Sequence, residues 1–315
     1  MFLDVDMPDH AWSLVLAASA SARALDAAAD IAAFRIEDAQ LRPVAVGSED
    51  ETLRWIPSAG WESKLPQADP GSAVADLYLP VCSATSARPI TVGHLGQSLD
   101  GFIATHAGES QFVTGDGNII HLHRMRALSD AVVVGAGTVA ADDPQLTTRL
   151  VPGLHPMRVV FDPSRRLSSH YRIFSDATAP TLYICERSRI EAGETHVGLA
   201  PIVGINDDTS EIGPGEALRI LRERGCSRVF VEGGGVTVSA FLAAGLLDRL
   251  QIAVAPLLIG DGRPAIRLAP QANLRDCLRP VHRVFRMGGD VLFDCDLRAR
   301  ASEDAPGPPL VSRII

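Results

Sequence analysis

The segment best equipped for chemistry is a turn of three glycines between a buried strand and a helix, RVFVEGGGVTVSAFLAAG. Gly233, Gly234 and Gly235 carry no Cβ, so a ligand can approach the backbone closely there. The N–H groups at the start of the following helix favour an anion such as a pyrophosphate. Glu232 ends the strand, where open α/β sheets bind their ligands. A tight turn that merely needs glycine explains this segment equally well.

A second glycine turn, GAGTVA, follows the strand expected over 131–134. It fits the G-x-G-x-x-G/A pattern of dinucleotide-binding turns. However, Pro144 ends the next helix after about two turns, which is too short for that type of domain. The following strand ends at Asp162, further along than the expected acidic position. A standard Rossmann site is therefore disfavoured, although Thr138 and Asp142 supply polar groups beside the strand end.

The helix expected over 117–129 carries a charge on the face that should be buried. Ile119, Leu122, His123 and Arg126 fall at positions i, i+3, i+4 and i+7 of that helix. A buried guanidinium is costly unless it has an anionic partner. An internal carboxylate, a boundary position with access to water and a bound phosphate all meet that need, and the sequence leaves the three open.

Other kinds of chemistry have little support. His121 and His123 lack the H-E-x-x-H pattern and companions at metal-ligand spacing, so no metal site is expected. Asp142 and Asp143 are typical of one solvated and one capping carboxylate. No G-x-S-x-G elbow is present, which leaves a hydrolase triad unsupported.

Alternating strands and helices from residue 89 onward have to position these groups. Strands are expected at 89–95, 131–134, 158–162, 181–185, 228–232, 250–259 and 291–297. Helices are expected at 117–129, 214–224 and 236–247. This alternation predicts a three-layer α/β domain with a mostly parallel sheet. The long strand after the last helix is expected to pair antiparallel with the final strand.

Residues 1–88 differ in composition from the rest of the chain. They are Ala-rich with clusters of turn residues, and they contain all three tryptophans. We expect a helix over 13–34 and a short strand over 74–81, and we interpret the segment as a small N-terminal extension of unknown role. Residues 89–298 form the expected α/β domain. The Pro-rich residues 299–315 are expected to be a mobile tail.

The whole-chain composition argues against a nucleic-acid partner. The chain has 29 Lys and Arg against 38 Asp and Glu, a net charge of −9, whereas nucleic acids need a clustered basic face. Asp4 and Asp6 stand where a signal peptide would be basic, and Arg23 interrupts the apolar run after Leu14, so we expect no membrane segment. The five cysteines show no C-x-x-C spacing, which predicts a reduced, cytoplasmic protein.

In order, the motifs resemble the reductase domain of riboflavin biosynthesis, which has a dihydrofolate-reductase-like fold. They are SLDGFIAT, GESQFVTG, LHRMRALSDAVVVGAGTVAADDPQLTTR, RVVFDPSRR, FVEGGG and APLLIG, and the resemblance covers residues 89–298. It implies NADPH-dependent reduction of 5-amino-6-(5-phosphoribosylamino)uracil, a phosphorylated pyrimidine whose ribosyl group becomes ribityl. It also implies a homodimer, with the strand at 250–259 at the interface.

The resemblance further implies roles for individual residues. The family's substrate positions match Ser110, Arg126, Leu146, Arg149 and Glu232. Its cofactor positions match Gly96, Phe112, Thr138, Asp142, Gly233, Gly234, Gly235 and Thr237. Ser164 with Arg165 or Arg166 lies where such folds contact the 2′-phosphate, which favours NADPH over NADH. Glu232, Asp142 and His94 are the candidate catalytic groups, and none of them is assigned as the proton donor.

Three departures from the family pattern keep alternatives open. His94 stands where the family often has Lys, and Phe102 where a basic residue is common. Residues 1–88 lack the H-x-E and P-C-x-x-C motifs of the zinc deaminase to which many such reductases are fused. One alternative is a reductase of the same fold that acts on another specialised or salvage metabolite. The other is a non-catalytic nucleotide-binding protein, which the unexplained N-terminal segment motivates.

Overall fold

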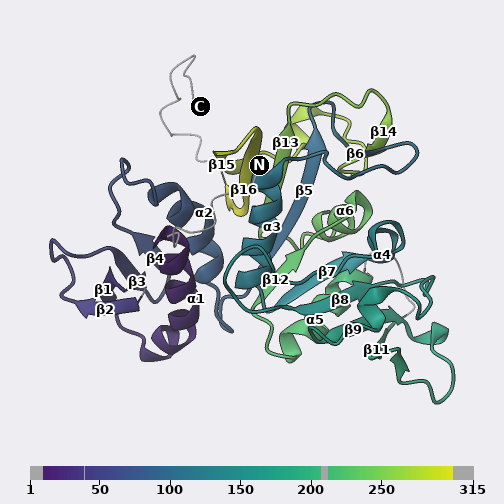
Figure 1. Cartoon of the computed structure of the whole chain (residues 1–315), viewed down its shortest axis with the longest axis horizontal. Coiled ribbons are helices and arrows are strands. Elements are labelled where there is room, and N and C mark those ends of the chain that lie inside the picture. The colour runs from purple at the N-terminus through teal and green to yellow at the C-terminus, as the bar shows by residue number, and fades with distance from the viewer. Residues whose placement is uncertain (1–9, 39, 207–211, 301–315) are drawn as a thin grey trace. The chain divides into compact units, whose positions relative to one another are not determined.

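The computed structural model describes residues 10–38, 40–206 and 212–300, and the chain forms two compact units, Met1–Pro89 and Ile90–Ile315 (Figure 1). The first unit contains two helices that pack on each other, α1 (His10–Ala28) and α2 (Ser72–Cys82). Its four strands are β1 (Ala32–Glu37), β2 (Gln40–Val44), β3 (Leu53–Ile56) and β4 (Gly60–Ser63). They form an antiparallel sheet in the order β2-β1-β3-β4.

The tryptophans form much of the core of the first unit. Trp12 meets Tyr78 edge-on with 5.5 Å between the ring centroids, and Trp55 meets Trp61 at 5.3 Å. The Trp61 indole Nε1 donates to the carbonyl of Ala18 at 3.0 Å, which joins β4 to α1. The packing of these large rings, together with the bond from Trp61, gives this unit a core of its own.

Two expectations for the first unit are wrong. The helix ends at Ala28, because Ala29 takes a left-handed φ of 60°, and Phe34 lies in β1 instead. Residues 74–81 belong to helix α2, not to a strand. Their buried side chains recur at the helical spacing i, i+3, i+4 and i+7, as shown by Ala75, Tyr78, Leu79 and Cys82.

The second unit is a three-layer α/β structure built on a ten-stranded sheet, in the order β10-β11-β9-β8-β7-β12-β5-β13-β16-β15. Its strands are β5 (Ile90–Ser98), β7 (Ala131–Gly135), β8 (Met157–Phe161), β9 (Thr181–Glu186), β10 (His196–Val197), β11 (Ala200–Ile205), β12 (Arg228–Val231), β13 (Arg249–Ala255), β15 (Pro280–Met287) and β16 (Asp290–Arg300). Neighbours are parallel from β11 to β13 and antiparallel elsewhere. The sheet is therefore mostly parallel, as predicted, and β13 pairs antiparallel with β16.

Two neighbouring residues of β5 show how helices cover both faces of this sheet. A Cβ on Gly93 would lie 3.3 Å from Val238 of α6 (Gly235–Ala243), whereas His94 bonds to Asn118 of α3 (Asp116–Leu128). Since successive strand residues face opposite sides, α3 and α6 lie on opposite faces. Helix α5 (Ile212–Glu223) packs beside α6, and the short α4 (Ala136–Asp142) follows β7 directly.

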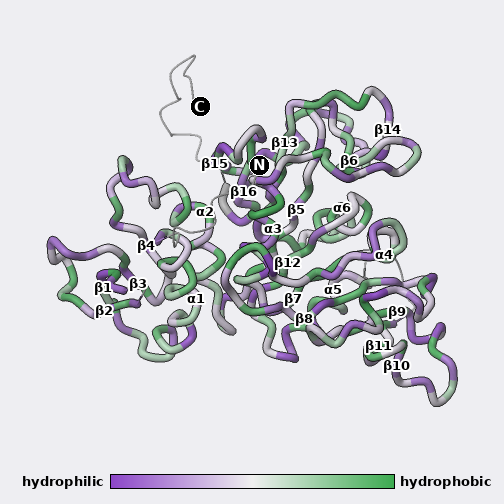
Figure 2. Tube along the Cα trace, in the orientation of Figure 1, coloured by the Kyte–Doolittle hydropathy of each residue, from purple (hydrophilic) through white to green (hydrophobic). Residues whose placement is uncertain are grey.

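The apolar strands between these layers are buried throughout. Every residue of β7 and of β12 is buried, including Arg228 at the start of β12, and most residues of both strands are hydrophobic on the hydropathy scale that colours Figure 2. Near-continuous apolar runs are typical of parallel strands covered on both faces. The burial pattern explains why the sequence predicted these strands well.

The remaining strands were harder to predict. In this unit, the sequence patterns did not predict β10, β11, β15 or the small antiparallel pair of β6 (Phe102–Thr105) with β14 (Gly262–Pro264). Helix α6 ends at Ala243, short of the expected 247, because the chain turns at Gly245 with a φ of 66°. The expected tail over 299–315 overlaps the end of β16 and otherwise lies outside the described residues. Among the described helices, none has the length and apolar character needed to span a membrane.

Candidate functional site

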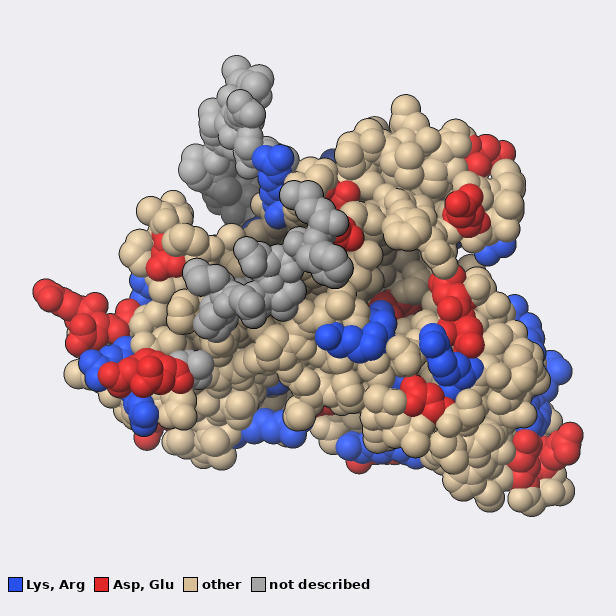
Figure 3. Space-filling model, in the orientation of Figure 1, with Lys and Arg blue, Asp and Glu red and all other residues tan. Residues whose placement is uncertain are grey.

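A cavity of about 800 Å³ lies at the carboxyl ends of the parallel strands in the second unit. Its walls come from β5, from the turns after β7, β8 and β12, and from α3, α4 and α6. Figure 3 shows a hollow in this unit with acidic and basic side chains around it. Cavities of this size hold ligands as large as cofactors, and open α/β sheets bind ligands at this edge.

A buried ion pair forms part of the cavity wall. Arg126 of α3 donates from Nε to Glu232 Oε2 at 3.0 Å and from Nη2 to Oε1 at 2.8 Å. The two side chains are only 10% and 5% exposed. Of the three partners that the sequence left open for Arg126, the structure shows the internal carboxylate. The fork geometry fixes both groups in one orientation.

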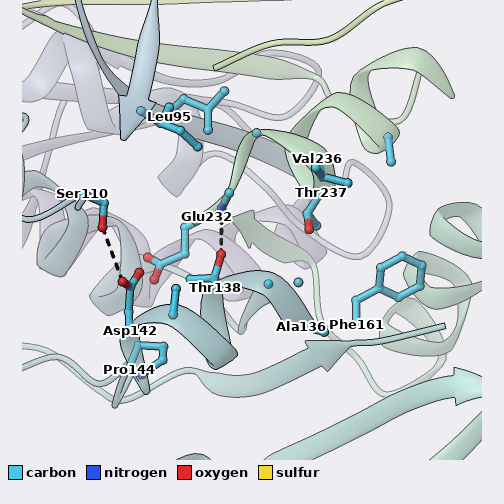
Figure 4. A pocket seen from close by; sticks show the side chains of 18 of the residues that line it. Leu95, Ser110, Ala136, Thr138, Asp142, Pro144, Phe161, Glu232, Val236 and Thr237 are labelled. Carbon is cyan, nitrogen blue, oxygen red and sulfur yellow. Dashed lines mark hydrogen bonds between the residues drawn. The ribbon is translucent and has the colours of Figure 1, made fainter. Parts of the chain in front are cut away.

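The other residues predicted to bind substrate divide into two sets. Ser110 and Leu146 line the cavity, and the Ser110 hydroxyl donates to Asp142 at 3.4 Å, joining the segment before α3 to the end of α4 (Figure 4). Arg149 is not among the lining residues. Its Nη1 donates to Thr147 Oγ1 at 2.8 Å, and burial together with nearby Arg126 lowers its pKa.

The three-glycine turn lies between β12 and α6 and lines the same cavity. Gly233 has a φ of +100°, which side chains rarely adopt. A Cβ on Gly235 would lie 2.0 Å from the carbonyl oxygen of Ala265. The Gly234 N–H donates to Thr138 Oγ1 at 2.8 Å, which ties this turn to α4 (Figure 4). A bare backbone cradle at the start of a helix fits a pyrophosphate group well.

Most residues predicted to bind a cofactor line the cavity, and two do not. The lining set includes Gly96, Thr138, Asp142, Ser164, Gly233, Gly234, Gly235 and Thr237. Phe112 is 86% exposed with a φ of 66°, and it lies outside the wall. Arg165 is paired with Glu194, whereas the neighbouring Arg166 lines the cavity.

His94 contributes a neutral imidazole to the wall. The ring is 3% exposed, and its Nε2 lies 2.9 Å from Asn118 Oδ1. Burial lowers the pKa of His94 to about 4, and the positive charge of Arg126 also acts to lower it. The candidate catalytic groups Glu232, Asp142 and His94 thus share one cavity, with Glu232 already neutralised by Arg126.

Several lining residues were missed by the sequence analysis. They are Thr114, Asn118, Glu186, Asn206, Arg263 and Arg267. Asn118 falls at i, with Leu122 and Arg126 at i+4 and i+8, and this spacing along α3 is the feature that identifies it. In the described part of the chain, no cluster of three His, Cys, Asp or Glu side chains is arranged to hold a metal ion.

Three buried histidines predict how stability depends on pH. Burial lowers the pKa of His94 and His123 from 6.5 to about 4 and that of His121 well below 6.5. Between about pH 6.5 and 4, these three histidines therefore bind protons in the unfolded chain but remain largely neutral in the folded chain. As the pH is lowered across that range, we expect the free energy of unfolding to fall by several kcal/mol, on the order of 1.4 kcal/mol per pKa unit per group. Urea unfolding at a series of pH values measures it.

Two histidine variants make that prediction specific. His123→Asn removes one of the titrating groups and should flatten the dependence on pH. His106→Asn changes an exposed histidine and should leave the dependence of stability on pH unchanged. Equal pH slopes for wild type and His123→Asn would contradict the assignment.

Comparisons with known proteins give the same picture of this unit. The family model described as "RibD C-terminal domain" matches residues 90–286. The 2,5-diamino-6-ribosylamino-4(3H)-pyrimidinone 5′-phosphate reductase of Methanothermobacter thermautotrophicus is 30% identical over 213 residues, which are 66% of this chain and 97% of that protein. The riboflavin biosynthesis protein RibD of Mycobacterium tuberculosis is 34% identical over 201 residues, 62% of this chain and 51% of the relative.

A solved structure agrees with these relatives. A diaminohydroxyphosphoribosylaminopyrimidine deaminase/5-amino-6-(5-phosphoribosylamino)uracil reductase from Thermotoga maritima matches with a TM-score of 0.56 and 27% identity, over 72% of this chain and 61% of that one. The chain spans about half the length of the RibD relatives and nearly all of the archaeal reductase. With its sheet, its cavity and the family match over most of its length, the chain belongs to the RibD C-terminal domain family.

Proposed function

We propose that this chain is a reductase that converts a phosphorylated ribosylaminopyrimidine, of the 5-amino-6-(5-phosphoribosylamino)uracil type, to its ribityl form with NADPH. The relatives named as reductases support the reaction class. One observation carries the proposal for this chain: a single cavity combines a glycine cradle at a helix start with a buried, hydrogen-bonding wall around Arg126 and Glu232. The same resemblance implies a cytoplasmic homodimer, and sedimentation analysis tests the dimer.

The cofactor end of the cavity would lie along the turns after β8 and β12. The start of α6 would hold the pyrophosphate, and Ser164 with Arg166 would hold the 2′-phosphate. Asp162 stiffens the turn after β8, because its Oδ2 accepts from the N–H of Arg166 at 2.6 Å and from the Tyr183 hydroxyl at 2.8 Å. A turn that is already ordered loses less conformational entropy when a ligand binds. A bound nicotinamide supplies the hydride, and the protein supplies its orientation.

The substrate end would lie between α3, β5 and the end of α4. Arg126 and Glu232 present a rigid polar edge, and Ser110 adds a hydroxyl from the opposite segment. Leu122 and Leu146 line the wall beside them and limit the access of water. Among the described residues of this wall, Arg126 is the only buried cation and is already paired with Glu232. These residues therefore act mainly by binding and orienting the sugar chain next to the hydride donor.

Arg166 provides a test of the cofactor choice. Its side chain is 67% exposed and lines the cavity, and its Nε lies 3.6 Å from the buried Asp162 carboxylate, so Arg166→Ala removes a charge and one ion pair without opening a core. We expect NADPH affinity to fall about tenfold, the scale of one charged hydrogen bond, and NADH affinity to stay the same. Dinucleotide titrations followed by fluorescence measure both. Arg165→Ala, which removes the partner of Glu194, is the control, and equal losses for the two dinucleotides would contradict the assignment.

The reaction itself is tested with the purified full chain. The protein is mixed with NADPH and either 5-amino-6-(5-phosphoribosylamino)uracil or 2,5-diamino-6-ribosylamino-4(3H)-pyrimidinone 5′-phosphate, and nicotinamide absorbance is followed. Oxidation coupled to formation of the ribityl product is the expected result. Tight NADPH binding with no turnover of either pyrimidine would reject the proposed substrate class.

A further inference from the structure

An amide and an imidazole form a buried pair in the cavity wall. Asn118 is 2% exposed and His94 is 3% exposed, and Asn118 Oδ1 lies 2.9 Å from His94 Nε2. Asn118 Nδ2 in turn donates to Thr114 Oγ1 at 2.9 Å. All three residues line the cavity, so the pair adjoins the space that a ligand would fill.

The geometry of this pair decides which ring nitrogen carries the proton. A neutral imidazole has one N–H and one acceptor nitrogen. An amide oxygen only accepts, and in this structure the Asn118 oxygen faces the ring while Nδ2 faces the Thr114 hydroxyl. The proton therefore belongs on Nε2, and Nδ1 keeps its lone pair. Among the described residues, no group donates to His94 Nδ1.

The neighbouring histidines show how distinct this arrangement is. His123 Nδ1 accepts the Arg149 N–H at 2.9 Å, so the protein itself uses that acceptor. His121 Nε2 lies 3.0 Å from Gln251 Oε1, which is a similar amide–imidazole pair. However, His121, His123 and Gln251 all lie outside the cavity wall. Of the three buried rings, His94 alone combines a fixed proton with a position in the cavity wall.

We propose that Asn118 is a positioning residue that holds His94 as the Nε2–H tautomer, so that Nδ1 accepts a hydrogen bond from a hydroxyl or amino group of the phosphorylated pyrimidine substrate. The inference deepens the proposed function and rests on it. The charged group that most affects the ring is Arg126, whose positive charge disfavours protonation and is itself balanced by Glu232. His121, also on α3, and Gln251, opposite His94 in β13, are the polar neighbours on the remaining sides.

The tautomer is measured without any substrate. Long-range ¹H–¹⁵N spectra of the full chain with labelled histidine report the protonation of each ring nitrogen, and His94→Gln identifies the His94 signals among the nine histidines. We expect an Nε2–H ring that stays neutral from pH 8 to pH 5.5. A ring protonated on Nδ1, or a cation at pH 7, would overturn the proposal. Lack of turnover with both pyrimidines would reject the proposed function while this spectrum still stands.

Kinetics with saturating NADPH test the substrate contact. Asn118→Asp keeps the shape but places a carboxylate beside the ring, which raises the pKa of His94 and turns Nδ1 into a donor at low pH. We expect the pyrimidine KM of Asn118→Asp to rise about tenfold between pH 8 and pH 6 with kcat nearly unchanged, and that of the wild type to stay flat. A purely structural role would give no such dependence on pH.

Two further variants complete the test. Asn118→Leu frees the tautomer and should raise KM about tenfold at every pH. Gln251→Leu removes the matching amide from His121, outside the cavity wall, and should leave the pyrimidine KM within about twofold. If Gln251→Leu raised KM as much as Asn118→Leu, the effect would come from packing, and the proposal would be wrong.

Discussion

Replacing Arg126 with Leu is expected to lower the free energy of unfolding by about 3–5 kcal/mol and to abolish turnover. The change leaves the carboxylate of Glu232, with only 5% of its side chain exposed, buried without its partner. Breaking a buried pair from one side costs far more than the pair itself contributes. Urea unfolding measures the loss of stability, and the pyrimidine assay measures the loss of activity.

A double variant and a surface ion pair show whether the loss of stability comes from the unpaired buried charge. Arg126→Leu combined with Glu232→Leu removes both charges and should recover much of the stability but none of the activity. Arg219→Leu breaks the pairs of an arginine that is 57% exposed, with Glu223, which is 58% exposed, and with Glu216, and it should cost less than about 1 kcal/mol. If Arg126→Leu were as mild as Arg219→Leu, the buried pair would not have the energetic role assigned to it.

Replacing Gly235 with Ala is expected to weaken dinucleotide binding at least tenfold and to destabilise the fold by about 1–3 kcal/mol, the usual cost of overpacking. The new methyl would lie 2.0 Å from the carbonyl oxygen of Ala265 and 2.9 Å from that of Pro264. Because both obstacles are backbone atoms, either the start of α6 or the segment after β14 has to move. Thermal unfolding and NADPH titration of the full chain measure the two effects.

Gly215 supplies the matched control for this change. It lies in α5 outside the cavity wall, and a Cβ there would meet only Leu246 Cδ1 at 3.9 Å. Gly215→Ala should therefore stabilise the chain by about 0.5–1 kcal/mol through helix propensity and keep the affinity for NADPH. Equal behaviour of the two alanine variants would show that the turn tolerates a side chain.

The sequence was most informative where burial acts on uniform segments. The strands β7 and β12 and the glycine turn after Glu232 could be located because short apolar runs bounded by turn residues favour buried strands. By contrast, the sequence left three partners open for Arg126, since it shows that a buried charge needs an anion but not which one. That choice depends on β12 and α3 meeting across 106 residues, a contact that no local pattern encodes.

The residues predicted for the site and those that line the cavity differ where the direction of a side chain decides the outcome. Arg165 and Arg166 are adjacent, and only the left-handed φ of 49° at Arg165 and its pairing with Glu194 separate the one that lines the cavity from the one that does not. Phe112 likewise takes a positive φ and is exposed. Such turns depend on surrounding packing, which composition and periodicity do not describe.

The position of β5 in the sheet has a consequence for how the chain acquires its structure. This first strand of the second unit sits between β12 and β13, with Val92 opposite Phe230 and Arg249. More than half of the unit must be synthesised before β5 gains either neighbour, because β12 begins at Arg228 and β13 at Arg249, and such non-local pairing makes folding slow. Meanwhile an apolar strand whose first six residues end up buried stays open to other chains. Recovery from denaturant should accordingly decline as protein concentration rises, long before the native state itself becomes unstable.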